Sequence, residues 1–361
     1  MVKEERWKYS SYIIILYIFV MFCIYPFYYE NGYYNMGTAK CRFFLMVSAA
    51  AVLGLFITVM SDVIRQKESV NIVERLKKIS ITEKWLYVYM VCILLSYILS
   101  DFKESVLWGD TEWCMGTLPL LLIGLLSVVI IHIWVEQEWL EVALFIVSAV
   151  IFLLGICNRF SVYPIPLEPK VPEFISMLGN INWFCGYMSV ISPIGIGLFI
   201  FKEYEHKWQK WALSLYLWIV FITGFCQGSS SVFLWNVALF FVLFWILVKN
   251  TSGMKKWLLT VAMWGMSGQI VRILKILFEE RYNYDSSLFV DTNVTFMIAL
   301  TALFFYAVLN YGYKEEREWS ETTFPILRDA QSASSLSTSR PRSSGQRRSR
   351  GSSHLRCLAR V

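Results

Sequence analysis

Two cations stand inside a long apolar stretch near residues 257–278. Arg272 and Lys275 lie three positions apart, which places both on one face of a helix. Fixed cations hold phosphate through charge-assisted hydrogen bonds, so this pair is suited to two linked phosphates. We therefore expect a pyrophosphate site at Arg272 and Lys275. The alternative is that both side chains only extend to the nearest polar surface along their aliphatic stems.

A polar turn contains Gly179, Asn180 and Asn182 and precedes another apolar stretch, which contains Gly186 and Tyr187. One interpretation is that the backbone amides and carboxamides of this turn face a ligand. The other is helix capping, because an Asn at a helix start accepts hydrogen bonds from the free backbone N–H groups. The sequence leaves both interpretations open.

A second polar turn is formed by Gly228, Ser229 and Ser230, directly before the apolar stretch at 231–248. A helix N-terminus presents free N–H groups and the positive end of the helix dipole, and this arrangement binds phosphate. A Ser side chain in the same place can instead cap the helix. This turn is therefore a second candidate for anion binding, with capping as its alternative.

The composition indicates which solvent surrounds these stretches. The chain has 361 residues, of which 57% are apolar and only 17% charged, and its mean hydropathy is +0.51. A soluble domain holds about 25% charged residues. A helix of about 20 apolar residues crosses a bilayer. Such stretches occur near 11–29, 43–60, 85–100, 118–135, 140–156, 183–201, 211–226, 231–248, 257–278 and 294–312. We therefore expect an all-α, polytopic membrane bundle of about ten transmembrane helices.

Lys and Arg predict which helix ends face the cytoplasm, because cytoplasmic loops carry an excess of both residues. With the N-terminus inside, the inner segments contain Lys3, Arg6, Lys8, Arg65, Lys67, Arg75, Lys77, Lys78, Lys84, Lys202, Lys207, Lys210, Lys249, Lys255 and Lys256. The outer segments contain Lys40, Arg42, Lys103, Arg159, Lys170 and Arg281. We expect a multi-pass protein of the cell membrane whose polar turns and cations face the extracytoplasmic side.

The chain changes character after residue 312. We expect residues 1–312 to form the membrane domain and residues 313–361 to form a basic, Ser- and Arg-rich cytoplasmic tail that is disordered, because the tail has too few apolar residues to offset its ordering entropy. A shifted reading frame after about residue 325 would also produce this change in composition. The expected partner is the lipid bilayer, and no nucleic acid is expected.

The cysteines and histidines do not form a metal-binding pattern. Eight cysteines are scattered along the chain without a Cys-x-x-Cys pair, and there are three histidines. Structural metal sites need clustered Cys and His ligands. We therefore expect no metal ion and no cofactor. Cys41 and Cys114 both fall in outer segments, so they are the pair that could form a disulfide.

The first polar turn carries a resemblance to a known family. The sequence at 179–188 is Gly-Asn-Ile-Asn-Trp-Phe-Cys-Gly-Tyr-Met. It resembles the Gly-Asn-Pro-Asn-x-x-Ala-Gly-Tyr-Leu signature of the O-antigen ligase and polymerase-like membrane proteins, with Ile181 in place of Pro. The spacing to the turn at Gly228 is also similar, although Ser230 or Ser231 stands where the family has Arg. The resemblance extends over much of the region 85–250.

The resemblance implies a membrane glycosyltransferase that needs no metal ion. Such a protein transfers a glycan from an undecaprenyl-diphosphate carrier to an acceptor in cell-surface polysaccharide assembly. In that reaction Asn180 and Asn182 would shape the turn beneath the sugar. Arg159, Arg272 and Lys275 would hold the pyrophosphate and stabilise the leaving group as its charge develops. The general base that takes the acceptor proton stays open among Glu173, Asp285 and Asp291.

Two further interpretations remain. Family members carry a large outer domain between late helices, and no such domain follows Asn310 in this sequence. A chain truncated before that domain would be an inactive fragment or an accessory membrane protein. A transporter or flippase of the same lipid-linked glycan would also need cations that face a cavity. That class predicts an internal repeat, and the sequence contains no second Asn-x-Asn string of this kind.

Overall fold

The computed structural model describes residues 8–66, 79–110, 113, 115–283 and 288–312. The expectations for the tail at 313–361, for Cys114 and for Asp285 concern residues outside this part of the chain.

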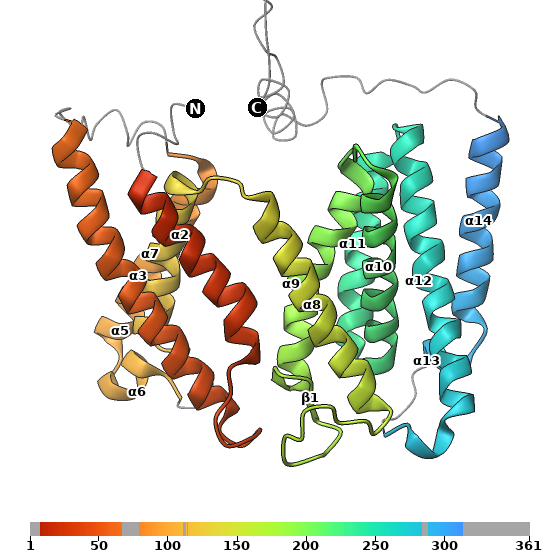
Figure 1. Ribbon diagram of the computed structural model, residues 1–361, viewed down its shortest axis with the longest axis horizontal. Helices are drawn as coiled ribbons and strands as arrows, with labels where there is room; N and C mark the ends of the chain where they lie inside the picture. The colour runs from red at the N-terminus through yellow and green to blue at the C-terminus, as the bar shows by residue number, and fades with distance from the viewer. Residues whose placement is uncertain (1–7, 67–78, 111–112, 114, 284–287, 313–361) are drawn as a thin grey trace, which may run out of the picture. The chain divides into compact units, whose positions relative to one another are not determined.

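The described residues form long helices joined by short loops, with a single pair of very short strands (Figure 1). In chain order the helices are α2 (Lys8–Phe19), η1 (Val20–Ile24), η2 (Tyr25–Phe27), α3 (Met36–Gln66), α5 (Ile81–Leu99), α6 (Lys103–Trp108), α7 (Thr117–Ile133), α8 (Glu138–Arg159), α9 (Ile181–Phe201), α10 (Lys207–Gln227), α11 (Ser230–Leu247), α12 (Thr251–Leu277), η3 (Glu279–Arg281), α13 (Leu288–Asp291) and α14 (Val294–Gly312). The strands β1 (Phe174–Ile175) and β2 (Gly179–Asn180) pair antiparallel, with Phe174 opposite Asn180.

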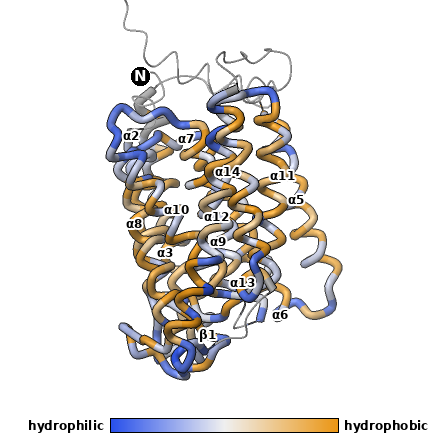
Figure 2. The backbone as a smooth tube through the Cα atoms, turned by 90° about the vertical axis from the view of Figure 1, so that its right-hand side faces the viewer, coloured by the Kyte–Doolittle hydropathy of each residue, from blue (hydrophilic) through white to orange (hydrophobic). Residues whose placement is uncertain are grey.

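The helices have the length and composition of membrane spans. Within the described residues, 9 helical segments are long and apolar enough to cross a membrane, and α7 adds a shorter apolar helix of 17 residues. Figure 2 shows hydrophobic residues along the middle of the helices and hydrophilic residues gathered toward their ends. The expected all-α, multi-pass membrane bundle of about ten helices is therefore confirmed.

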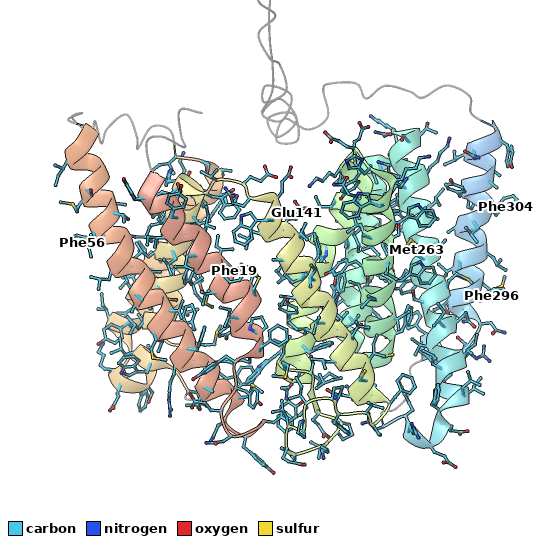
Figure 3. The ribbon with its side chains drawn as sticks, in the orientation of Figure 1. Phe19, Phe56, Glu141, Met263, Phe296 and Phe304 are labelled. Carbon is cyan, nitrogen blue, oxygen red and sulfur yellow. The ribbon has the colours of Figure 1, made fainter. Side chains whose placement is uncertain are left out.

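Large apolar side chains cover the outside of the helices. Phe56 on α3 is 66% exposed and Phe304 on α14 is 64% exposed, and both point away from the neighbouring helices (Figure 3). Met263 on α12 is buried instead. Water would penalise so many exposed apolar side chains, whereas hydrocarbon does not. A lipid bilayer is therefore the environment that fits this surface.

Several helices begin earlier in the chain than their apolar pattern predicts, and α12 shows why. The apolar stretch begins near residue 257, but α12 begins at Thr251. Asn250 caps it, because its side-chain Oδ1 accepts a hydrogen bond of 2.8 Å from the backbone N of Gly253. The cap extends the helix by about one and a half turns beyond its apolar core.

The largest buried cluster lies among α8, α9, α10, α11 and α12. Its fully buried aromatic members are Phe152, Phe184, Phe199, Phe221 and Phe225. A separate cluster forms where α2, α3 and α7 meet, around the buried residues Ile14, Leu55 and Leu126. These clusters fix the helices whose ends carry the candidate site.

The backbones of α12 and α14 approach each other closely because α12 offers glycines. A Cβ on Gly265 would lie 2.5 Å from the backbone oxygen of Thr295, and a Cβ on Gly268 would lie 2.8 Å from the Thr295 hydroxyl. Small residues permit this kind of close helix packing in membranes. Gly265 and Gly268 therefore set the distance between α12 and α14.

The two ends of the bundle differ in what they carry. In Figure 1 the strands, α6 and α13 lie at one end. At the other end, the ion pair between Lys202 Nζ and Glu141 Oε2, at 3.1 Å, joins the end of α9 to the first turn of α8. The polar turns singled out from the sequence lie at the end that carries the strands and α13.

Candidate functional site

The Asn180 turn is built by the strand pair and by a helix cap. Gly179 has a φ of +93°, a conformation that favours glycine, and it reverses the chain before α9. Asn180 is the N-cap of α9, and its Oδ1 accepts a hydrogen bond of 2.8 Å from the backbone N of Asn182. The capping interpretation is therefore confirmed for Asn180. Contact of this turn with a ligand stays a prediction.

A small cavity of about 200 Å³ opens beside this turn. It is lined by Tyr33, Tyr34, Met36, Gly37, Trp113, Phe174, Gly179, Asn180 and Trp183. Trp113 and Trp183 meet edge to face with ring centroids 5.8 Å apart, and Tyr33 stacks on Phe174 at 5.1 Å. An aromatic cavity with a single carboxamide at its wall suits a compact ring with an apolar face and a polar edge.

Tyr33 also anchors the Pro-bearing loop, residues 160–178. Its backbone N donates to the carbonyl of Glu168 at 2.8 Å, and its hydroxyl donates to the carbonyl of Ser176 at 2.7 Å. Asn158 holds the same segment from α8, because its Oδ1 accepts from the backbone N of Ser176 at 2.7 Å. Burial raises the pKa of Tyr33, so its hydroxyl keeps its proton for this contact. The loop is therefore fixed against α8 and against the segment that precedes α3.

Arg159 lies inside the protein rather than at its surface. Only 1% of the residue is exposed. Its Nε donates to Oε1 of Gln227 at 3.0 Å, and its Nη1 donates to the carbonyl of Pro172 at 2.8 Å. These contacts tie the end of α8 to the loop and to the end of α10. The structure gives Arg159 a positioning role, and direct binding of a diphosphate by Arg159 stays a prediction.

The Gly-Ser turn joins α10 to α11. Gly228 ends α10 with a φ of 61°, in the left-handed region. Ser229 occupies the N-cap position of α11, but its hydroxyl bonds to that of Ser231 at 2.8 Å, and no side-chain cap forms. Ser230, the next residue, is exposed. The expected Ser side-chain cap is therefore absent at Ser229, and anion binding at this turn stays a prediction.

The two polar turns meet through the first turns of α9. The Cys185 thiol lies beside the hydroxyls of Ser229 and Ser231 and near Arg159. Gly186 is exposed, and a Cβ added there would meet nothing within 4 Å. The ring of Tyr187 packs against Phe152, with centroids 5.9 Å apart. The segment 179–188 therefore contributes one capped turn, one glycine that faces open space and one packed aromatic ring.

The two cations of α12 lie where α12 meets α13 and the start of α14. Lys275 Nζ and Asp291 Oδ1 form an ion pair at 2.8 Å. Arg272 Nη1 donates to Oδ1 of Asn293. Both cations are half-buried, so they keep access to the surface. Helical i, i+4 spacing would allow Lys275 to pair with Glu279, but α12 ends at Leu277, before that residue, and Lys275 pairs with Asp291.

The cations form two groups at the same end of the bundle. Arg159 is one group, and Arg272 with Lys275 is the other. Tyr282 lies between them, because its ring is 5.9 Å from Lys275 Nζ and its hydroxyl donates to the carbonyl of Cys226 at 3.2 Å. Cys226 is next to Gln227, the partner of Arg159. Within the described ranges, no hydrogen bond or ion pair joins Asn180 to Arg272 or Lys275. The structure thus places the turn and the cations at one end without direct contact.

Sequence reasoning missed several members of this site. Gln227 had a signal, because it directly follows the apolar stretch 211–226 and precedes a glycine. Asn293 lies in a short polar segment before the last apolar stretch. Tyr33 and Trp113 had no sequence signal, because they are distant in sequence from the Asn180 turn and reach it only through the fold.

Among the residues that the structure describes, no group of three or more His, Cys, Asp or Glu side chains is placed to hold a metal ion. Cys41 is disulfide-bonded, and its expected partner Cys114 is outside the described residues. The described free thiols are Cys23, Cys92, Cys157, Cys185 and Cys226.

Comparison with known proteins gives no relative from which a function can be transferred. No protein-family model, no curated protein and no solved structure matches this chain.

Proposed function

We propose that this multi-pass membrane protein is an O-antigen ligase-like glycosyltransferase. It binds a glycan linked to an undecaprenyl-diphosphate carrier at the extracytoplasmic ends of its helices and transfers the glycan to an acceptor of the cell surface. The observation that carries the proposal is the meeting of the two polar turns at Cys185, at the bundle end that also holds Arg272 and Lys275. The family resemblance is carried by these same turns.

Two observations support the extracytoplasmic assignment of this end. The first is the excess of Lys and Arg in the segments at the opposite end. The second is the disulfide at Cys41, which lies in the first turns of α3, next to the loop that carries Tyr33. Disulfides persist in oxidising compartments outside the cytoplasm. Both support an extracytoplasmic Asn180 turn.

The diphosphate is assigned to Arg272 and Lys275. Two half-buried cations one helical turn apart can each take one of two linked phosphates. When the diphosphate binds Lys275, it replaces the carboxylate of Asp291, which lies 2.8 Å from the ammonium group. Asp291 then lies beside the bound diphosphate, where its carboxylate can accept a proton. We therefore assign it as the general base.

The reaction is a direct displacement. The hydroxyl oxygen of the acceptor attacks the anomeric carbon of the glycan, and the bond from that carbon to the diphosphate oxygen breaks. The electron pair leaves with the diphosphate, whose added charge the two cations stabilise. The proton of the hydroxyl passes to Asp291. The aromatic cavity beside Asn180 holds a sugar ring farther along the glycan, and Arg159 positions the loop that lines it.

Membranes that contain the full chain test the proposal. The transfer of glycan from undecaprenyl diphosphate to acceptor is followed in the parent, in Arg272→Ala with Lys275→Ala, and in Asp291→Asn. The matched control is Lys249→Ala, which removes an exposed cation just beyond the end of α11 at the opposite end of the bundle. We expect the double variant and Asp291→Asn to lose at least about tenfold in rate, since general-base and charge stabilisation each contribute at least that much.

The outcomes separate the candidate functions. Loss of transfer in the site variants and full transfer in Lys249→Ala support the proposal. Equal transfer in the parent and the double variant contradicts the assignment of the cations. If the parent binds the carrier but transfers no glycan, the chain is an accessory carrier-binding protein or a carrier transporter, and the enzymatic proposal fails.

A further inference from the structure

A long apolar groove runs along the outside of α12 and α14 beside the end of α11. Its volume is about 880 Å³. Phe244 of α11, Trp257 and Val261 of α12, and Met297, Ala302 and Phe305 of α14 are among the residues that line it. Asn293 and Thr301 are its polar members. The groove is far larger than the cavity at Asn180, and its lining is almost entirely apolar.

The groove has the length of a lipid chain. Along α14 its lining extends from Asn293 to Leu309, a distance of about 24 Å at 1.5 Å per residue. This covers most of the roughly 30 Å hydrocarbon thickness of a bilayer. The close contact of Gly265 and Gly268 with α14 holds the two walls together, so the groove is a built feature of the bundle.

The groove ends at the cations of the proposed site. Asn293 belongs to its lining and accepts a hydrogen bond from Arg272. Lys275 lies one turn farther along α12 and pairs with Asp291, two residues before Asn293. The apolar groove, which covers most of the hydrocarbon thickness, thus ends at two basic side chains. The complementary ligand is an amphiphile with a long hydrocarbon tail and an anionic head of two phosphates.

We propose that this groove binds the isoprenoid tail of a polyprenyl diphosphate, with the diphosphate held by Arg272 and Lys275. The inference rests on the proposed function and deepens it by naming where the carrier tail lies. A single-phosphate membrane lipid could fill the same apolar space, but it offers one phosphate to two cations that stand one helical turn apart. The tail contributes affinity in proportion to the apolar area that it buries.

Binding tests this without requiring transfer. The full chain is placed in phosphatidylcholine nanodiscs, and the Kd values of undecaprenyl diphosphate and of the short geranyl diphosphate are measured. Thr301→Trp places a bulky ring in the groove from an exposed position, where it leaves the helix packing intact. Leu303→Trp makes a change of the same kind on α14 outside the groove lining and is the matched control.

We expect Thr301→Trp to weaken undecaprenyl diphosphate binding by at least about tenfold, because the new ring displaces the tail from part of the groove and so removes buried apolar area. Binding of geranyl diphosphate stays within about twofold of the parent, and Leu303→Trp changes neither value. Thermal unfolding confirms that both variants fold. If Thr301→Trp does not fold, Val294→Trp, at an exposed position of the same groove, replaces it.

Three results would overturn the inference. One is an unchanged Kd of the long carrier in a folded groove variant. Another is an equal loss for the long and short ligands. The third is equally strong competition by phosphatidylglycerol, which would make the groove a general lipid site. Each leaves the transfer test of Arg272 and Lys275 intact. Conversely, tail-dependent binding without transfer by the parent would retain the groove and reject the enzyme.

Discussion

The guanidinium of Arg159 and the carboxamide of Gln227 meet inside the protein, where Nε donates to Oε1 across 3.0 Å. Both residues are shielded from solvent and lipid, since Arg159 is 1% and Gln227 0% exposed. A second hydrogen bond, from Nη1 of Arg159 to the carbonyl of Pro172, adds the Pro-bearing loop. The ends of α8 and α10 and this loop are therefore fixed as one unit.

Loss of the Arg159 side chain should destabilise that unit. In Arg159→Met the carboxamide oxygen of Gln227 loses its donor in a buried place, which costs about 1–3 kcal/mol. Adding Gln227→Leu removes the unsatisfied group, so the double variant should regain part of the loss. Thermal unfolding of the purified protein measures both effects. Equal melting temperatures of the parent and Arg159→Met would contradict the positioning role of Arg159.

The cap at Asn180 predicts a difference between two neighbouring asparagines. Asn180→Ala removes the side chain that accepts from the backbone N of Asn182, and should cost about 1 kcal/mol. Asn180→Asp keeps an acceptor and should retain stability. Asn182→Ala keeps the backbone donor and is the control. A transfer defect in Asn182→Ala at parental stability would identify its exposed carboxamide as a ligand contact, whereas a stable Asn180→Ala would disprove the cap.

The glycines of α12 and α9 predict opposite responses to the same substitution. In Gly268→Ala the new Cβ would lie 2.8 to 3.0 Å from the side chain of Thr295, so α14 must shift. We expect a loss of about 1–3 kcal/mol, typical of overpacking. Gly186→Ala enters open space and should be neutral or stabilising. Chemical or thermal unfolding compares them, and similar losses in both variants would contradict the close contact of α12 with α14.

Tyr204 predicts a dependence of stability on alkaline pH. It lies between α9 and α10, and burial, with a smaller contribution from Glu141, raises its pKa to about 12. The unfolded chain ionises this phenol near its ordinary pKa of about 10, while the folded chain keeps it neutral. Its contribution to stability is therefore complete below pH 10 and is lost as the pH rises from 10 toward 12.

The matched variant isolates this contribution. Tyr204→Phe cannot ionise, so its stability relative to the parent should improve as the pH rises through that window. Unfolding curves of both proteins between pH 8 and 11.5 make the comparison. Parallel curves over the whole range would show that burial does not hold Tyr204 neutral.

The sequence predicted the helices well and the site contacts poorly, for different physical reasons. A membrane span is a local property of composition, so stretches such as 183–201 and 294–312 correspond to α9 and α14. A cap is also local, and Asn180 was a cap candidate for that reason. Helix starts such as Thr251 were missed, because the cap at Asn250 extends α12 through polar residues that have no apolar pattern.

Contacts between distant segments have no local signal. Helical spacing alone would allow Glu279 to pair with Lys275, but α12 ends before Glu279, and the partner of Lys275 is Asp291. Arg159 was expected to face a ligand, because nothing near it in the chain shows that Gln227 lies beside it in the fold. The aromatic cavity combines residues from α3, the segment before α7, and β2, which only tertiary packing brings together.

Cysteine labelling measures directly whether the Asn180 turn opens to the extracytoplasmic headgroup layer. Asn182→Cys places a thiol at an exposed position of the turn, and Glu205→Cys places one in the exposed connection at the opposite end of the bundle. Intact cells are treated with a membrane-impermeant maleimide, with the parent chain as background. We predict labelling of position 182 in intact cells and labelling of position 205 only after the cells are lysed. The reverse pattern would contradict the account.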